Sequence, residues 1–105
     1  MPIWAVASIT EEPEVLLSDW QVVEIPGGTR HFVGYNQSLR EGRVSSMIVE
    51  FDPATRTGIT SSGRVYRLLG EPGENQDALW TWTGWCRVNG VTSATVVTEE
   101  ALSGR

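Results

Sequence analysis

Residues 75–90 constrain the fold most, because this segment can form either a helix or a further pair of strands. As a helix, it begins at a capping Asn75 or Asp77 and ends at Gly90, a residue that readily terminates helices. Its apolar side chains then share one stripe at spacings of three and four: Ala78, Leu79, Trp82, Trp85 and Cys86. We therefore expect an amphipathic helix here.

The same residues also fit a hairpin. Residues 79–83 alternate between apolar and polar side chains, Gly84 suits a bulge, and Asn89-Gly90 suits a tight turn into a strand over 91–97. Thr and Trp are indifferent helix formers, which favours the strand, whereas the distance between the two caps and the single stripe favour the helix. The hairpin stays open as the alternative.

Upstream, short strand-like runs alternate with turn signals. The runs are 20–25, 31–35, 44–51, 58–60 and 64–69, and the turns are 26–28, 52–55 and 61–63. We expect residues 10–17 to form a short helix or capped turn, 36–42 a loop, and 98–102 a last helical turn. The prediction is an α+β fold in one small domain over 1–105: an antiparallel β-meander of four to five strands with one C-terminal helix packed on it.

The alternation within two of these runs predicts which side chains share a face. In the run over 31–35, His31, Val33 and Tyr35 lie on one face, while Phe32 and the preceding Arg30 lie on the other. In the run over 44–51, the apolar residues of one face are Met47, Val49 and Phe51.

Composition limits the class of protein. The net charge of −5 disfavours non-specific nucleic-acid binding, and no apolar run approaches the roughly 18–20 residues that cross a bilayer. The first eight residues lack the basic and apolar regions of a signal peptide, and Cys86 is the sole cysteine. We expect a cytoplasmic protein without membrane contact or an internal disulfide.

All cationic side chains are arginines, and six of the eight lie between residues 30 and 67. That segment holds only three acidic residues and carries a net charge of +3, while the flanking residues sum to −8. Arginine suits directional pairing with carboxylates or phosphates. The basic middle therefore predicts a recognition surface, although ion pairs within the protein would explain the same charges, and a GC-rich genome would explain the absence of lysine.

Enzyme signatures are mostly absent. A nucleophilic pair would require the fold to join His31 to Cys86, and both residues are more typical of packing or hydrogen bonding. A structural zinc site needs about four Cys or His ligands, and the glycine pairs lack the Lys-Ser/Thr ending of a phosphate-binding loop. We expect no catalytic residue, no metal and no cofactor.

Five residues are candidates for binding a partner. In the helix, Trp80 lies opposite the apolar stripe, on a face shared with Gly84 and Arg87, a composition enriched at interaction hot spots. Arg43 and Arg64 lie near the distal ends of adjacent strands, where they can combine with Tyr66. The alternatives are that Trp80 packs under the 36–43 loop and that the arginines form ion pairs.

The pattern Ser62-Gly63-Arg64-Val65-Tyr66-Arg67-Leu68, Gly70-x-x-Gly73, Asp77-Ala78, Trp82, Trp85 and Asn89-Gly90 resembles small uncharacterised proteins encoded by phages, prophages and other mobile elements of Proteobacteria. The resemblance covers roughly residues 20–98 and brings no catalytic residues. It implies a small protein that blocks a host protein, such as a component of host defence.

These observations predict a non-catalytic binding protein that acts by occluding a host protein partner. The first alternative is a nucleic-acid-binding domain that uses the arginine-rich middle, with Tyr66 or Trp80 stacking on bases. The second is a small enzyme or ligand-binding protein with a pocket around His31, Tyr35 and Cys86. A virion component is a further alternative.

Overall fold

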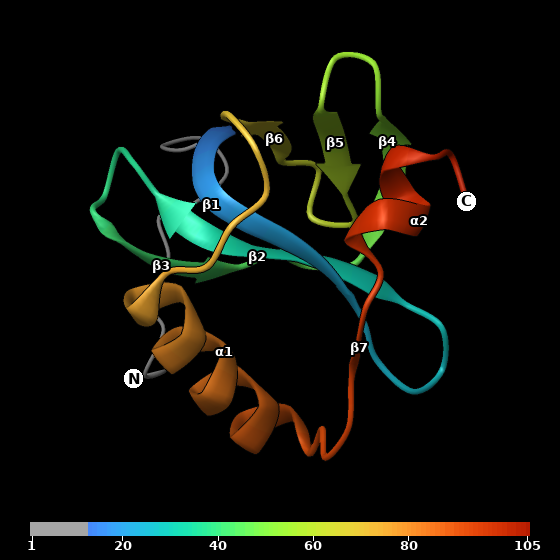
Figure 1. Ribbon diagram of the computed structural model, residues 1–105. Coiled ribbons are helices and arrows are strands. Elements are labelled where there is room, and N and C mark those ends of the chain that lie inside the picture. The colour runs from blue at the N-terminus through green and yellow to red at the C-terminus, as the bar shows by residue number, and fades with distance from the viewer. Residues whose placement is uncertain (1–12) are drawn as a thin grey trace.

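Seven strands and two helices make up residues 13–105, the part of the chain that the computed structural model describes (Figure 1). The strands are β1 (Glu14–Glu24), β2 (Arg30–Asn36), β3 (Glu41–Val44), β4 (Ile48–Asp52), β5 (Thr57–Thr60), β6 (Val65–Leu68) and β7 (Thr95–Val96). The helices are α1 (Gln76–Asn89) and α2 (Thr98–Leu102). The fold is α+β, as predicted, with more strands than the four to five expected.

The long strand β1 joins the two halves of the sheet, whose order is β3-β2-β1-β6-β5-β4. β1 pairs with β2 along most of its length, with β6 through residues 14–17, and with β7 through residues 23–24. The β1–β6 pair is parallel and the others are antiparallel, so the sheet is mixed rather than wholly antiparallel.

A bulge in β1 brings the apolar residues of the main core from both halves of the strand onto one face of the sheet. The register against β2 shifts between Ser18 and Gln21, and Asp19 has a φ of 47°. The residues buried before the bulge are Val15 and Leu17, and those after it include Trp20 and Val22. An extra residue in a strand changes its alternation by one position, so odd positions before the bulge and even positions after it point into the same core.

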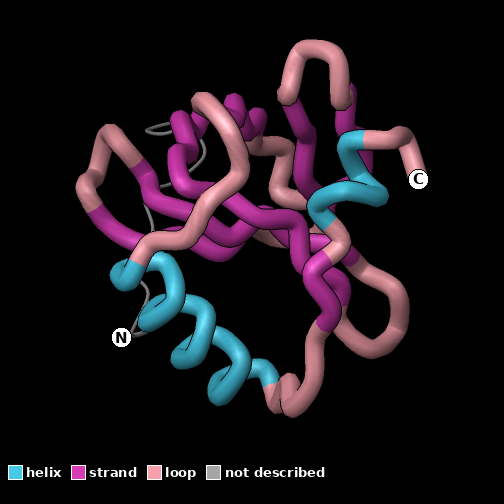
Figure 2. Tube along the Cα trace, viewed as in Figure 1, coloured by secondary structure: helices cyan, strands magenta, loops and turns pink. Residues whose placement is uncertain are grey.

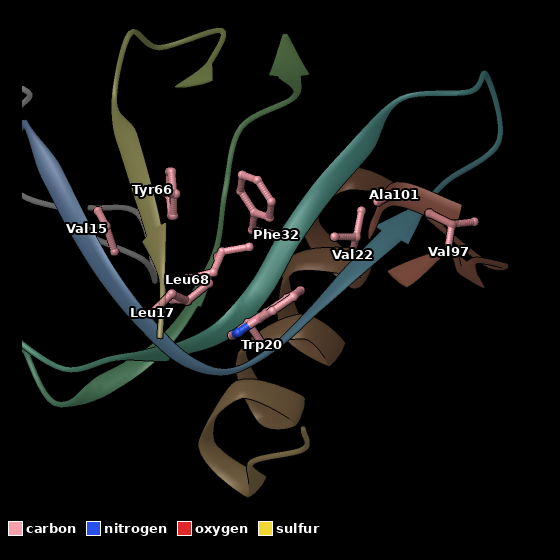
Figure 3. Packing of buried hydrophobic residues seen from close by; sticks show 9 residues of the cluster. All are labelled: Val15, Leu17, Trp20, Val22, Phe32, Tyr66, Leu68, Val97 and Ala101. Carbon is pink, nitrogen blue, oxygen red and sulfur yellow. The ribbon is translucent and has the colours of Figure 1, made fainter. Parts of the chain in front are cut away.

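The main core lies on this face of β1. Its buried side chains come from β1, β2, β6 and the α2 region: Val15, Leu17, Trp20, Val22, Phe32, Tyr66, Leu68, Val97 and Ala101. Figure 3 shows them as a continuous row that runs from β6 to the α2 region. A Cβ atom on Gly58 would lie 2.4 Å from the Phe32 ring, so the glycine in β5 provides the room for this ring.

A second, smaller core lies on the opposite face, under α1. It consists of Val23, Val33 and Ala78, with Val44 and Trp82 packed against it. Val22 and Val23 thus point to opposite cores, and so do Phe32 and Val33, as alternation along a strand requires. The expected division of the 31–35 strand into two faces is confirmed.

The helix predicted over 75–90 is confirmed together with both caps. The Asn75 side chain accepts a hydrogen bond from the backbone N–H of Ala78, and Gly90 closes the helix in the left-handed conformation with a φ of 67°. Figure 2 shows α1 as a separate layer beside the strands. The expected last helical turn is α2. Neither described helix is both long and apolar enough to cross a membrane.

The prediction of a helix or turn over residues 10–17 is wrong where the structure describes it. Residues 14–17 belong to β1, and residues 10–12 lie outside the described part of the chain. The pairing of this segment with β6, which aligns Val15 with Tyr66 and Leu17 with Leu68, outweighs the local capping signal.

The strand predicted over 44–51 is two strands, and the loop predicted over 36–42 includes the start of β3. The β2–β3 ladder ends at Ser45. Its backbone N–H still donates to the Phe32 carbonyl, but its hydroxyl rather than its carbonyl accepts from the Phe32 N–H, at 2.8 Å. Beyond this break, Val49 points to solvent while Phe51 packs against the main core.

Candidate functional site

Three of the predicted partner-binding residues lie inside the protein. Arg43 is 4% exposed, Arg64 is 8% exposed, and Tyr66 is part of the main core. The Arg43 Nε donates a hydrogen bond to the Tyr66 hydroxyl at 3.0 Å, and its guanidinium lies 5.8 Å from the centre of the tyrosine ring. The structure therefore brings Arg43 and Tyr66 together, but in a buried contact rather than in the surface patch that was expected.

Other arginines of the 30–67 segment pair with acids from outside it. The pairs are Arg30 with Glu24, Arg56 with Glu71 and Arg67 with Glu14. Arg56 also donates to the Gly70 carbonyl, and its guanidinium lies 5.6 Å from the centre of the Trp20 ring. Much of the charge separation along the sequence is thus neutralised when the acidic flanks fold against the basic middle.

The remaining two candidates lie on the outer face of α1. Trp80 is 70% exposed, and Arg87 follows it by seven residues, so both project from the same side of the helix. Arg87 lies in the last turn, where a cation is favoured by the helix dipole. Leu79, which is 63% exposed, and Val88 flank these two residues on opposite sides of the helix, and we call the whole exposed surface the α1 outer face (Leu79, Trp80, Arg87 and Val88).

The exposure of Leu79 corrects one detail of the predicted stripe. Thr81 faces the sheet in its place and is buried. The cause is Gly42 in β3, where an added Cβ atom would lie 2.2 Å from the Asp77 carbonyl and 2.4 Å from the Thr81 hydroxyl. The helix backbone approaches β3 so closely that there is no room for a Cβ atom at position 42, and a glycine in a strand is typical of such a close approach.

A groove of about 510 Å³ lies beside α1, and nothing in the sequence identified it. Its apolar walls come from the sheet, α1 and β7: Val23, Val33, Ala78, Leu79, Trp82 and Val96. Asp19 and Glu74 lie on its rim, and the lining contains no cationic residue. Because Leu79 belongs both to the groove and to the α1 outer face, the two form one continuous surface.

Of the residues suggested to form a pocket, His31 makes contacts typical of hydrogen bonding and packing. The two ring nitrogens of His31 are bonded to the Ser45 carbonyl at 2.9 Å and to the Thr29 hydroxyl at 3.1 Å. The ring is buried and packs against Trp85, with 5.0 Å between the ring centres. Burial raises the pKa of the Cys86 thiol above its ordinary value, which lowers the fraction of reactive thiolate.

Residues 13–105 contain no group of three or more His, Cys, Asp or Glu side chains that could hold a metal ion. Comparison of the chain with protein-family models, with curated proteins and with solved structures finds no significant match.

Proposed function

We propose that this chain is a non-catalytic binding protein and that the α1 outer face docks on a partner protein, which it occludes. The observation that supports the proposal most strongly is the exposure of Trp80, with Leu79 and Val88 more than 60% exposed on the same helix. Contiguous exposed apolar surface on a protein is typical of an interaction site. Tryptophan and arginine are also the residue types most enriched at interaction hot spots.

The packing of α1 suits this role, because the inner face holds the helix in place without using the outer one. Ala78 and Trp82 belong to the smaller core, and the Trp82 and Trp85 rings stack with 5.4 Å between their centres. The two caps fix both ends of the helix. A partner would therefore meet a helix that is already formed, and little conformational entropy would be lost on binding.

The arginine-rich middle supports nucleic-acid binding less well than the sequence suggested. Its arginines are largely either buried or paired with carboxylates, and the whole chain carries a net charge of −5. The resemblance to mobile-element proteins makes a host protein the partner class that we propose. Three of the flanking acids, Glu14, Glu24 and Glu71, then serve in ion pairs within the protein.

The direct test replaces Trp80 by alanine. We expect the melting temperature to change little, because Trp80 is mostly exposed, and the affinity for the partner to fall by about 2 kcal/mol or more, as at a typical hot spot. Thermal unfolding and affinity capture from host lysate, with nuclease-treated and untreated samples, measure the two effects. Leu39→Ala, at another exposed apolar residue, is the matched control. A large loss of stability in Trp80→Ala would show that this side chain packs against the protein and would contradict the proposal.

A further inference from the structure

The groove beside α1 has an apolar floor and an acidic rim. Among its polar residues, Gln21 already donates to the Gly73 carbonyl at 3.1 Å and accepts from the Thr98 hydroxyl, and Asn75 caps α1. The carboxylates of Asp19 and Glu74 form no ion pair with another described residue. The groove therefore offers a partner two carboxylates that are not in ion pairs with described residues, next to apolar surface.

Asp19 and Glu74 come from two backbone segments that lie side by side, because the Gly73 N–H donates to the Trp20 carbonyl. The Asp19 carboxylate oxygen would lie 3.3 Å from a Cβ atom on Gly73, the residue that precedes Glu74. Asp19 occupies the bulge of β1, and Glu74 lies in the loop that leads into α1. A cation placed beside these segments would meet two negative charges without competition from an arginine of the lining.

From this charge complementarity we propose that the groove binds a segment of the partner protein that carries a bulky apolar side chain next to an arginine or lysine. The apolar side chain would pack against Leu79, Trp82 and Val96, and the cation would contact Asp19 and Glu74. This inference rests on the proposed function, and it names the chemistry that the partner presents to this protein.

The size and position of the groove favour a short protein segment over the other occupants. A volume of about 510 Å³ holds a few side chains, within the range of 300–1,000 Å³ typical of binding pockets. The groove opens onto the α1 outer face at Leu79, so a segment seated in it continues toward Trp80. A free small molecule in the groove would make no use of this connection to the α1 outer face.

The test selects ligands for the wild-type protein from a displayed library of random peptides and measures the affinity of the selected peptides by fluorescence polarisation. We expect the selected sequences to be enriched in an arginine or lysine beside a large apolar residue. Their affinity should fall with rising salt, because exposed charges are screened. A selection of acidic or uncharged peptides would overturn the proposal.

Two variants locate the binding. Asp19→Asn with Glu74→Gln removes the rim charges, and Asn suits the positive φ of residue 19. This double variant should weaken binding about three- to tenfold and reduce the salt dependence. Its control, Glu41→Gln with Glu50→Gln at two exposed acids outside the groove, should do neither.

Leu79→Ala tests the apolar part of the groove. It should weaken binding about tenfold, and Leu39→Ala is its control. Equal effects of the variants and their controls would overturn the assignment to the groove.

Two further results separate this inference from the proposed function. If a partner requires Trp80 but the peptides do not depend on the groove, the binding function stands and the groove proposal fails. If the peptides bind the groove but no partner depends on Trp80, the proposal for the α1 outer face fails instead. A concentration-dependent dimer that Leu79→Ala dissociates, measured by sedimentation, would assign the groove to a second copy of the chain and overturn the proposal.

Discussion

At the scale of single residues, the arginines between positions 30 and 67 contribute chiefly to the fold. Arg43 is buried against Tyr66, and Arg67 pairs with Glu14, which lies far away in the sequence. A buried guanidinium is expensive to desolvate and persists only where its donors are well satisfied. The surface pairs contribute little energy each, because solvent screens exposed charges.

Replacement of Tyr66 by phenylalanine tests the structural role of the Arg43 contact. The variant removes the hydroxyl that accepts from the Arg43 Nε, and we expect it to lower the free energy of unfolding by about 1.5–3 kcal/mol, the range for hydrogen bonds to charged groups. Urea unfolding measures the change. Tyr35→Phe, at a less buried tyrosine, is the control and should cost less than about 0.5 kcal/mol. Equal stability of wild type and Tyr66→Phe would contradict the buried contact.

The Cys86 thiol provides a second test at this scale. Burial raises its pKa, so the folded protein holds the thiol proton more tightly than the unfolded chain. Any stability linked to this proton is therefore present below the ordinary thiol pKa and is lost as the pH rises through the pKa of the folded state. Alkylation by iodoacetamide near pH 8 should be slower in the folded protein than in the urea-unfolded one. Faster alkylation of the folded protein would indicate an activated thiol and would revive the enzyme alternative.

At the scale of elements, the helix α1 is the feature that could best be predicted from the sequence. Its caps and much of its inner stripe depend on spacing within one short segment, and local signals of this kind are readable without tertiary information. The sequence did not predict how the helix is rotated about its own axis, which decides the residues that face the sheet. This rotation depends on Gly42, which lies in another element and admits Thr81 rather than Leu79 to the interface.

A methyl group on Gly42 tests how closely α1 approaches β3. Gly42→Ala places a Cβ atom 2.2 Å from the Asp77 carbonyl, so the helix must move. We expect a loss of about 1–3 kcal/mol in the free energy of unfolding, typical of overpacking, measured by urea titration. Glu41→Ala changes the neighbouring exposed position and should have little effect. An unchanged stability in Gly42→Ala would show that the helix lies farther from the strand.

At the scale of the whole molecule, the topology depends on contacts between residues that are distant in the sequence. The parallel pairing of β1 with β6 leaves no local pattern, because it is defined only by the partner strand. The groove likewise forms only when β1, β7 and α1 meet. Local alternation could predict most strand segments, while their order and the candidate groove required the folded chain.

The charge of the whole molecule predicts weak nucleic-acid binding. With a net charge of −5 and three arginines of the basic segment in ion pairs, little free positive potential remains to attract phosphates. Fluorescence anisotropy with a labelled oligonucleotide should show weak binding at physiological salt. Tight binding that falls steeply with salt would favour the nucleic-acid alternative.

Photo-crosslinking from position 80 tests most directly whether the α1 outer face binds a partner protein. A photoreactive phenylalanine analogue would replace Trp80 in one sample and Val49, an exposed apolar residue of β4, in a control sample, each mixed with nuclease-treated host lysate. We expect one protein to be crosslinked from position 80 and not from position 49. That crosslink should disappear when Arg87→Glu is added. The same crosslinks from both positions, or none from position 80, would contradict a binding role for the α1 outer face.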